Sequence, residues 1–198
     1  MPSLHTAGRA AALASAATGG AAAVYVGLVS GALHLDLGVG RTPRPLGPQV
    51  VHIAAPREVV FDVVAQPYLG RATRAMHEKV QVVERGDDMV LAVHHTPVHG
   101  RLTARTVETV RFTRPERVDF RVVRGPVPHV VETFMLSEQG SGTRLTYEGE
   151  MAADLWGLGS WWSARVGARW EEAVAGTFTS IRAEAERLHA VADRRHSQ

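Results

Sequence analysis

The sequence contains no cysteine among its 198 residues. A chain without cysteine cannot form a disulfide scaffold, use a thiol nucleophile, bind a metal through thiolates or carry the anchor of a bacterial lipoprotein. The absence of cysteine does not indicate whether the protein resides in an oxidising or a reducing compartment. The rest of the composition, with 45% hydrophobic and 21% charged residues, is typical of one globular domain with a short extra segment.

The chain also has little excess of either charge, since 22 lysines and arginines stand against 20 acidic residues. This balance does not indicate a polyanion-binding protein. Four basic residues are expected to share the outer face of a sheet: Arg101, Arg105, Arg111 and Arg121. Because no aromatic residues are interleaved with them, we predict a solvated surface or a weak contact with anionic lipid headgroups, and no nucleic-acid site.

Charge is missing altogether between Ala10 and Leu33. At a rise of 1.5 Å per residue, a helix of this length would cross a hydrocarbon core about 30 Å thick. Residues 1–34 are therefore interpreted as an apolar leader, with a membrane-spanning helix over residues 10–33. The composition is less persuasive, because alanine and glycine dominate. The alternatives are a cleaved secretory signal and a disordered leader rich in alanine and glycine.

The arginines that flank this run bear on orientation. Arg9 precedes it, whereas Arg41 and Arg44 follow it. The slight excess behind the run favours a single-pass membrane protein with a cytoplasmic main domain. If the leader is a cleaved signal, the main domain would instead be secreted.

Proline and glycine are frequent in residues 35–48, which predicts an extended linker. The folded domain is then expected over residues 49–192, followed by a tail over residues 193–198. No internal repeat is visible, and the oligomeric state cannot be read from the sequence.

The predicted domain begins with a short β-rich run at residues 49–54, and Pro56 and Glu58 mark the start of a helix. Alternating apolar and polar residues then predict six strands. These are expected at residues 77–84, 88–97, 100–113, 117–125, 129–138 and 143–152. Short turn segments separate them, so the strands should form an antiparallel meander.

The end of the chain has a different periodicity. From about Ser160, apolar residues recur every three or four positions and predict a helix of roughly thirty residues. They are Trp162, Val166, Trp170, Val174, Phe178, Ile181, Ala185 and Leu188. Such a stripe must be buried, and the concave face of a curved antiparallel sheet is the partner of matching length. We therefore expect an α+β fold in which about seven strands wrap around a long C-terminal helix.

Three segments carry a resemblance to a known family. They are Val51–Val64 (VHIAAPREVVFDVV), Gly142–Tyr147 (GTRLTY) and the helix Trp170–Leu188. Their order resembles the helix-grip fold of the START-like (SRPBCC) superfamily, which includes polyketide cyclase/dehydrase-like proteins, and the resemblance covers residues 49–190. It implies a hydrophobic cavity between sheet and helix for a lipid, sterol or polyketide. It implies no catalytic residue, because the superfamily has no universal catalytic motif.

Two carboxylates interrupt the apolar inner face of the predicted sheet, Glu108 and Glu132. Counting outward from the turns places Val122 opposite each of them. The two glutamates would then share one row, two strand spacings or roughly 10 Å apart.

The last predicted hairpin adds a glycine to this row. If Leu136 lies opposite Leu145, Gly149 falls beside Glu132 and Tyr147 falls beside Phe134. A glycine at this position would leave empty volume next to the carboxylate, which suits a polar group of a ligand.

We predict that these glutamates form the polar end of a mostly apolar pocket. The expected ligand-binding residues are His95, Glu108, Phe120, Val122, Glu132, Phe134, Tyr147, Gly149, Trp170 and Phe178. Buried carboxylates have raised pKa values and can act as general acid or base, so Glu108, Glu132 and Tyr147 are the candidate catalytic residues. Alternatively, each glutamate pairs with an arginine such as Arg124, or a β-bulge turns it outward.

No metal ion or other cofactor is expected. His94, His95 and His99 are close in sequence, but neighbours on a strand point to opposite faces, and no metal-binding motif is present.

A further group, Trp156, Trp161 and Trp162, lies at the start of the predicted long helix. These rings would gate the pocket, lie at a bilayer interface or pack the base of the sheet.

Two functions from different classes remain. The first is a membrane-tethered domain that binds or carries a small hydrophobic ligand without chemistry of its own. The second is a polyketide cyclase or dehydrase that uses the cavity carboxylates. An accessory protein that presents its sheet face to a partner is a third alternative.

Overall fold

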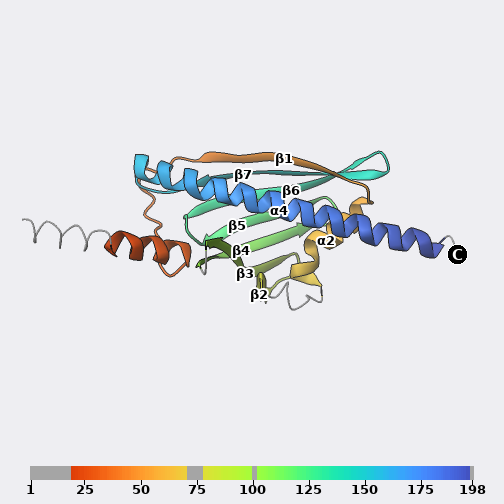
Figure 1. The fold of residues 1–198 in the computed structure, drawn as a ribbon, viewed down its shortest axis with the longest axis horizontal. Helices are drawn as coiled ribbons and strands as arrows, with labels where there is room; N and C mark the ends of the chain where they lie inside the picture. Colours follow the sequence, from red (N-terminus) through yellow and green to blue (C-terminus); the bar gives the residue numbers. More distant parts are fainter. Residues whose placement is uncertain (1–18, 71–77, 100–101, 197–198) are drawn as a thin grey trace, which may run out of the picture.

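The computed structural model describes residues 19–70, 78–99 and 102–196. Seven strands form one antiparallel sheet in the order β1-β7-β6-β5-β4-β3-β2. Helix α4 (Trp156–His196) lies across one face of this curved sheet (Figure 1). The α+β helix-grip fold expected from the sequence is therefore confirmed.

The six strands predicted from alternation are β2 to β7. The bounds are β1 (Arg44–Ile53), β2 (Val80–Arg85), β3 (Met89–His99), β4 (Leu102–Thr113), β5 (Arg117–Arg124), β6 (His129–Gln139) and β7 (Gly142–Ala152). Consecutive strands from β2 to β7 pair as antiparallel neighbours, so the predicted meander is correct.

Strand β1 begins at Arg44, inside the segment predicted as a linker, and not at Gln49. It pairs with β7 at the edge of the sheet, where prolines are tolerated, and an irregularity after Leu46 accommodates Gly47 and Pro48. Gly47 has φ +76°, and a Cβ there would lie 2.7 Å from the carbonyl oxygen of Tyr147. Only glycine fits this approach, so Pro45, Gly47 and Pro48, three of the residues that suggested a linker, belong to a bulged strand.

Helix α2 (Arg57–Leu69) follows β1 and covers part of the same face of the sheet as α4. Pro56 occupies its N-cap, and Val60, Phe61 and Val64 are buried. The helix packs against α4 and β6, so it closes one side of the core beneath α4.

Helix α4 is longer than predicted in both directions and includes residues 193–196, which the sequence pattern assigned to a tail. Its buried residues recur at intervals of three or four: Val174, Phe178, Ile181 and Ala185. Leu188 was predicted to continue this stripe but is 38% exposed. The C-terminal part of α4 extends past the end of the sheet (Figure 1).

The membrane-spanning helix predicted over residues 10–33 is not supported. Residues 10–18 lie outside the described part of the chain, and residues 19–29 are helical. No helix in residues 19–70, 78–99 and 102–196 is long and apolar enough to cross a membrane. The helix cannot continue through Gly31, because the φ angle of this residue is +72°, a left-handed conformation.

The chain around and after the end of this helix is attached to the sheet. Val29 is 5% exposed, and Arg124 donates hydrogen bonds to the carbonyl oxygens of Gly31 and Ala32 at 3.0 and 3.1 Å. Arg124 therefore binds backbone carbonyls, and it is not the partner of a buried glutamate that the sequence had suggested.

Candidate functional site

Glu132 lies on the inner face of β6, with only 6% of the residue exposed. Its Oε2 atom accepts hydrogen bonds from Tyr147 Oη at 2.9 Å and from Trp170 Nε1 at 2.7 Å. Burial, reinforced by the negative charge of Glu108, raises the pKa of Glu132 to about 7, although the two hydrogen bonds act in the opposite direction. The carboxyl group therefore exchanges its proton near neutral pH.

Glu108 lies on β4 and is 2% exposed, but its surroundings differ. Thr106 Oγ1 donates to its Oε1 at 2.5 Å, and His94 Nδ1 lies 3.2 Å from its Oε2. Tyr68 Oη lies 3.2 Å from the other imidazole nitrogen, Nε2. The result is a chain of polar groups that links α2, β3 and β4.

The two partners in this chain shift each other's pKa. Burial by itself raises the pKa of Glu108, but the charge and hydrogen bond of His94 and the hydroxyl of Thr106 outweigh it and lower this pKa. Burial likewise lowers the pKa of His94, but the attraction of Glu108 outweighs it and raises this pKa. Glu108 and His94 thus form an ion pair whose carboxylate is buried and whose imidazole is partly exposed, whereas Glu132 is the acid with a pKa near neutrality.

We use the name polar centre for these seven residues: Tyr68, His94, Thr106, Glu108, Glu132, Tyr147 and Trp170. Both tyrosines keep their protons, because burial and the nearby carboxylates raise the pKa of Tyr68 and of Tyr147. Tyr147 therefore acts toward Glu132 as a hydrogen-bond donor.

Aromatic rings surround the polar centre on the inner face. The ring centroids of Phe120 and Phe134 are 5.0 Å apart, and those of Phe134 and Phe178 are 5.2 Å apart. Phe134 also makes an edge contact with Tyr147, with ring centroids 5.9 Å apart.

Nine of the ten predicted ligand-binding residues lie in or beside this inner-face cluster: Glu108, Phe120, Val122, Glu132, Phe134, Tyr147, Gly149, Trp170 and Phe178. Their role toward a ligand stays a prediction.

His95 is the tenth residue, and its predicted position is wrong. It lies opposite Arg105, on the outer face, whereas His94 lies opposite Thr106 on the inner face. An irregularity between Pro97 and His99 shifts the pairing by one residue, and a one-residue shift exchanges the two faces of a strand. Alternation counted from the turn therefore selects the wrong histidine.

The predicted register is half correct. Glu108 does lie opposite Val122, but Glu132 lies opposite Phe120, so the two glutamates do not share a row. The counting assumed a short turn after Arg124. The pairing of β5 with β6 ends at Arg121 opposite Val131, so the connection is wider, and it contains Pro126 and Pro128, which cannot donate ladder hydrogen bonds. Trp162 Nε1 donates at 2.7 Å to the carbonyl oxygen of Pro126.

Gly149 lies beside Glu132 as predicted, but it does not leave empty volume there. A Cβ at this position would lie 2.6 Å from the carbonyl oxygen of Val131 and 2.8 Å from Cβ of Glu132. The glycine is therefore required for the close approach of β6 and β7.

Sequence reasoning missed Tyr68 and His94 as members of the site. Tyr68 follows Phe61 and Val64 at helical spacing, and this periodicity was the available signal that it faces the core. No signal in the sequence separated His94 from His95, because the irregularity between Pro97 and His99 that places His94 on the inner face is a feature of the strand pairing.

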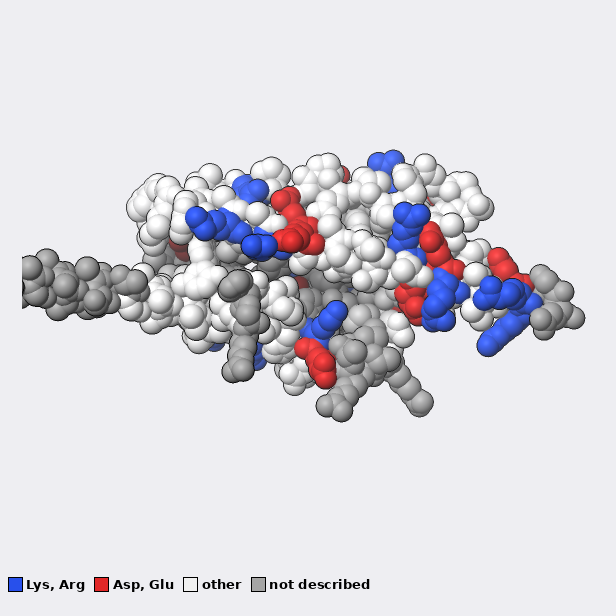
Figure 2. Space-filling view, viewed as in Figure 1, with Lys and Arg blue, Asp and Glu red and all other residues white. Residues whose placement is uncertain are grey.

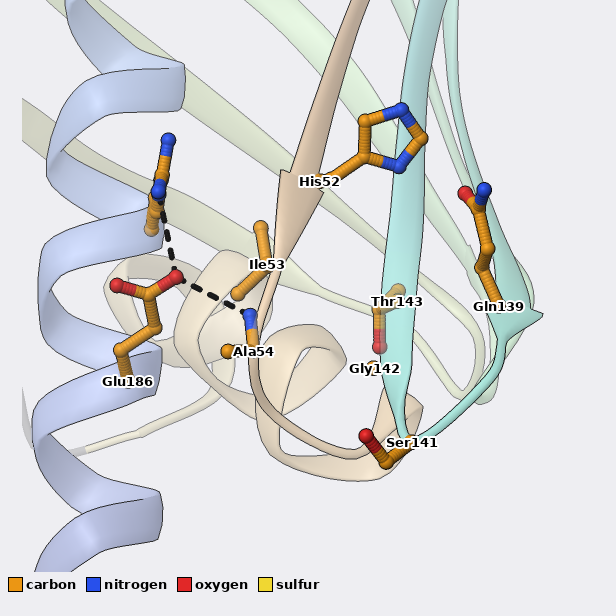
Figure 3. Close-up of a pocket in the computed structure, with 9 residues that line it drawn as sticks. His52, Ile53, Ala54, Gln139, Ser141, Gly142, Thr143 and Glu186 are labelled. Atoms are coloured by element: carbon orange, nitrogen blue, oxygen red, sulfur yellow. Dashed lines mark hydrogen bonds and ion pairs between the residues drawn. The ribbon is translucent and has the colours of Figure 1, made fainter.

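A surface pocket of about 330 Å³ lies away from the polar centre, where the β6–β7 hairpin and the end of β1 meet α4 (Figure 3). Figure 3 shows Glu186 accepting hydrogen bonds from the backbone N–H of Ala54 and from Arg182, both at 3.1 Å. None of the predicted ligand-binding residues lines this pocket.

Aromatic side chains occupy much of the inner face at the polar centre, where the sequence had predicted a cavity. Solvent still reaches this face, because the His94 side chain is 18% exposed and Phe112 and Trp170 are only half-buried. No group of three or more potential metal ligands occurs among the residues that the structure describes.

Comparisons with known proteins agree with this geometry. The model of a family described as polyketide cyclase / dehydrase and lipid transport matches residues 48–193. No curated protein matches the chain.

Among solved structures, the chain is similar to the Zhui aromatase/cyclase from Streptomyces sp. R1128, with a TM-score of 0.57 and 16% identity over 74% of this chain and 94% of that one. It is also similar to truncated norcoclaurine synthase from Thalictrum flavum, with a TM-score of 0.53 and 14% identity over 76% and 95% of the two chains. A protein from Thermus thermophilus has a TM-score of 0.52 and 17% identity over 73% and 94%. At these identities the likeness shows the fold.

Proposed function

Because the chain belongs to the polyketide cyclase / dehydrase and lipid transport family, we propose that it binds a small hydrophobic molecule at the polar centre. The observation that carries this proposal is a buried acid with a pKa of about 7 among aromatic rings, on an inner face that solvent reaches at His94. Such a site suits a ligand with a largely apolar body and one hydroxyl or carbonyl group, as in a lipid, sterol or polyketide.

The contacts of the polar centre support a definite orientation of the ligand. Both hydrogen bonds to Glu132 end on Oε2, so neither uses Oε1. A hydroxyl or carbonyl group of the ligand would bind Oε1, and the rings of Phe120 and Phe134 would contact its apolar body. Helix α4 packs on β1, β7 and α2, so the ligand would enter over β3 to β5 without separating those contacts.

The test is a fluorescence titration of the full chain with 2-naphthol, which combines a bicyclic apolar body with one hydroxyl. We expect quenching that disappears in Trp170→Phe, because Trp170 donates to Glu132 beside the proposed site. Glu132→Gln should weaken binding by about two- to tenfold, which corresponds to the loss of one hydrogen bond.

The matched control is Ser141→Phe, which fills the pocket at the far end of α4 without adding a tryptophan and should leave naphthol binding unchanged. Binding that is lost in Ser141→Phe but retained in Glu132→Gln would assign the ligand to that pocket instead. Absence of any Trp170-dependent quenching would also refute the proposal.

A second candidate function is dehydration of a β-hydroxy ketone, as in aromatic ring formation. Two properties of Glu132 favour this function. Its pKa is about 7, and its Oε1 atom takes no part in the hydrogen bonds from Tyr147 and Trp170. In this step the Glu132 carboxyl protonates the hydroxyl, which leaves as water. The resulting carboxylate removes the proton from the neighbouring carbon, so that a carbon–carbon double bond forms and the acid is regenerated.

This candidate is tested with 4-hydroxy-4-(2-naphthyl)butan-2-one, whose loss of water gives a conjugated enone that is followed by absorbance. A general acid with this pKa predicts that kcat/KM falls as pH rises above about 7. Glu132→Gln should lower the rate by about 100-fold or more. Binding of the ketone without turnover in the native chain would leave the carrier function alone.

A further inference from the structure

Exposed apolar residues are concentrated at one end of the molecule. Of the fifteen large hydrophobic residues that are exposed in the described part of the chain, nine belong to the helix over residues 19–29, the chain before β1 and the start of α4. We use the name apolar tip for the nine: Val24, Tyr25, Val26, Leu35, Leu37, Val39, Trp156, Leu158 and Trp161. Figure 1 shows the helix over residues 19–29, the chain leading to β1 and the start of α4 side by side at this end.

The backbone holds the exposed rings of the apolar tip in place. Leu155 and Trp156 have φ angles of 75° and 47°, a strained region for residues other than glycine. Their backbone N–H groups donate to the carbonyl oxygens of Val39 and Gly40 at 2.8 and 3.0 Å. Trp156 is 64% exposed in this backbone conformation, so a large apolar ring is held at the surface.

The chemistry of the apolar tip matches the interface of a bilayer. Tryptophan and tyrosine are favoured at the headgroup level, where an apolar ring and a polar N–H or O–H group are both accommodated. The Arg165 guanidinium stacks over the exposed Trp161 ring, 4.7 Å from its centroid, and so places a cation beside the rings that a lipid phosphate can bind.

The surroundings of the apolar tip favour lipid over another protein surface. The chain arrives at this end from a run without charge, from Ala10 to Leu33. On the face drawn in Figure 2, charged side chains of both signs lie further along α4, and the end where α4 begins is mostly uncharged.

We propose that the apolar tip docks this protein on the surface of a phospholipid bilayer. Trp156, Leu158 and Trp161 enter the headgroup region, and Arg165 pairs with lipid phosphate. Trp170 follows Trp156 by fourteen positions on α4, so the polar centre stands about 20 Å from the membrane surface along the helix. This docking goes beyond the ligand binding proposed above and does not depend on it.

The test is sedimentation of the full chain with phosphatidylcholine vesicles that contain one-third phosphatidylglycerol. The variant Trp156→Ser/Leu158→Ser/Trp161→Ser should lower the partition coefficient by about tenfold or more, because three large apolar side chains no longer enter the lipid. The matched control is Val50→Ser/Val83→Ser/Met135→Ser, which removes three exposed apolar residues away from the apolar tip and should bind as the native chain does.

A second measurement reports depth and does not depend on the total amount bound. Bromine-labelled lipids should quench the native tryptophan fluorescence, and most of this quenching should disappear in Trp156→Phe/Trp161→Phe. Equal binding by both serine variants, or quenching that persists in Trp156→Phe/Trp161→Phe, would overturn the proposal. Concentration-dependent dimers that the apolar-tip variant abolishes, without vesicle binding by the native chain, would assign the apolar tip to a second copy instead.

Discussion

At the scale of single residues, the inner face of the sheet gives two glutamates different protonation states. Glu108 keeps its charge because His94 and Thr106 bind its two oxygens. Glu132 has only neutral donors, Tyr147 and Trp170, so burial dominates its pKa. The identity of the partner, and not the depth of burial, therefore decides which carboxylate is available as an acid.

The raised pKa of Glu132 predicts a pH dependence of stability. The pKa rises from an ordinary value of 4.5 to about 7 on folding, so the folded state holds the proton more tightly. The stabilisation is complete below pH 4.5 and is lost as pH rises through about 7, for a total of about 3 kcal/mol. Glu132→Gln should remove this loss, so the variant gains on the native chain between about pH 5 and 8 in urea unfolding.

The control for this experiment is Glu148→Gln, which changes an exposed glutamate on β7 that faces away from the core. It should keep the native dependence of the unfolding free energy on pH. An unchanged slope in Glu132→Gln would show that Glu132 does not titrate in this range.

At the scale of elements, small irregularities decide which side chains reach the site. The shift between Pro97 and His99 brings His94 inward, and the wide connection after β5 places Glu132 opposite Phe120. The approach of β7 to β6 at Gly149 then sets the position of Glu132, because Glu132 Cβ lies directly against this glycine.

This close approach predicts opposite effects for two glycine substitutions. Gly149→Ala should lower the free energy of unfolding by about 1 to 3 kcal/mol, because the new Cβ meets backbone and Glu132 at under 3 Å. Gly176→Ala, at an open position on α4, should raise it by about 0.5 to 1 kcal/mol, because alanine favours a helix. Urea unfolding at one pH measures both, and a neutral Gly149→Ala would contradict the described packing of β6 on β7.

At the scale of the whole molecule, Asp154 joins the start of α4 to the chain before β1. Its carboxylate accepts hydrogen bonds from the N–H groups of Leu37 and Gly38 and from Arg41 Nε, at 2.5 to 2.9 Å. The Arg41 hydrogen bond is the largest of the effects that lower the pKa of Asp154 to about 2. The segment that carries part of the apolar tip is thereby fixed to the domain above this pH.

Removing this carboxylate should release the segment without unfolding the sheet. In Asp154→Ala we expect trypsin to cleave after Arg41 about tenfold faster or more, because the four hydrogen bonds from this segment to the carboxylate are lost. Asp36→Ala removes only the exposed partner of Arg41 and should change the rate by less than about twofold. Mass spectrometry of the fragments over time measures both rates, and equal rates would contradict the proposed role of Asp154.

The residue pattern alone was sufficient for the meander, the long C-terminal helix and the inward direction of Glu108 and Glu132. These features depend on periodicities of two and of about 3.6 residues, which local backbone geometry imposes. The same counting correctly placed Gly149 beside Glu132 and Val122 opposite Glu108.

Only the tertiary structure decided which histidine faces Glu108, how the two glutamates are offset and what holds the chain before β1. Each of these depends on a bulge, a proline-containing connection or a contact between residues more than 100 positions apart, such as Arg41 with Asp154. Local alternation cannot anticipate them, because a single extra residue exchanges the two faces of a strand. The absence of cysteine and of excess charge limited the classes of function, but the partners of each buried carboxylate determined the chemistry that the site can support.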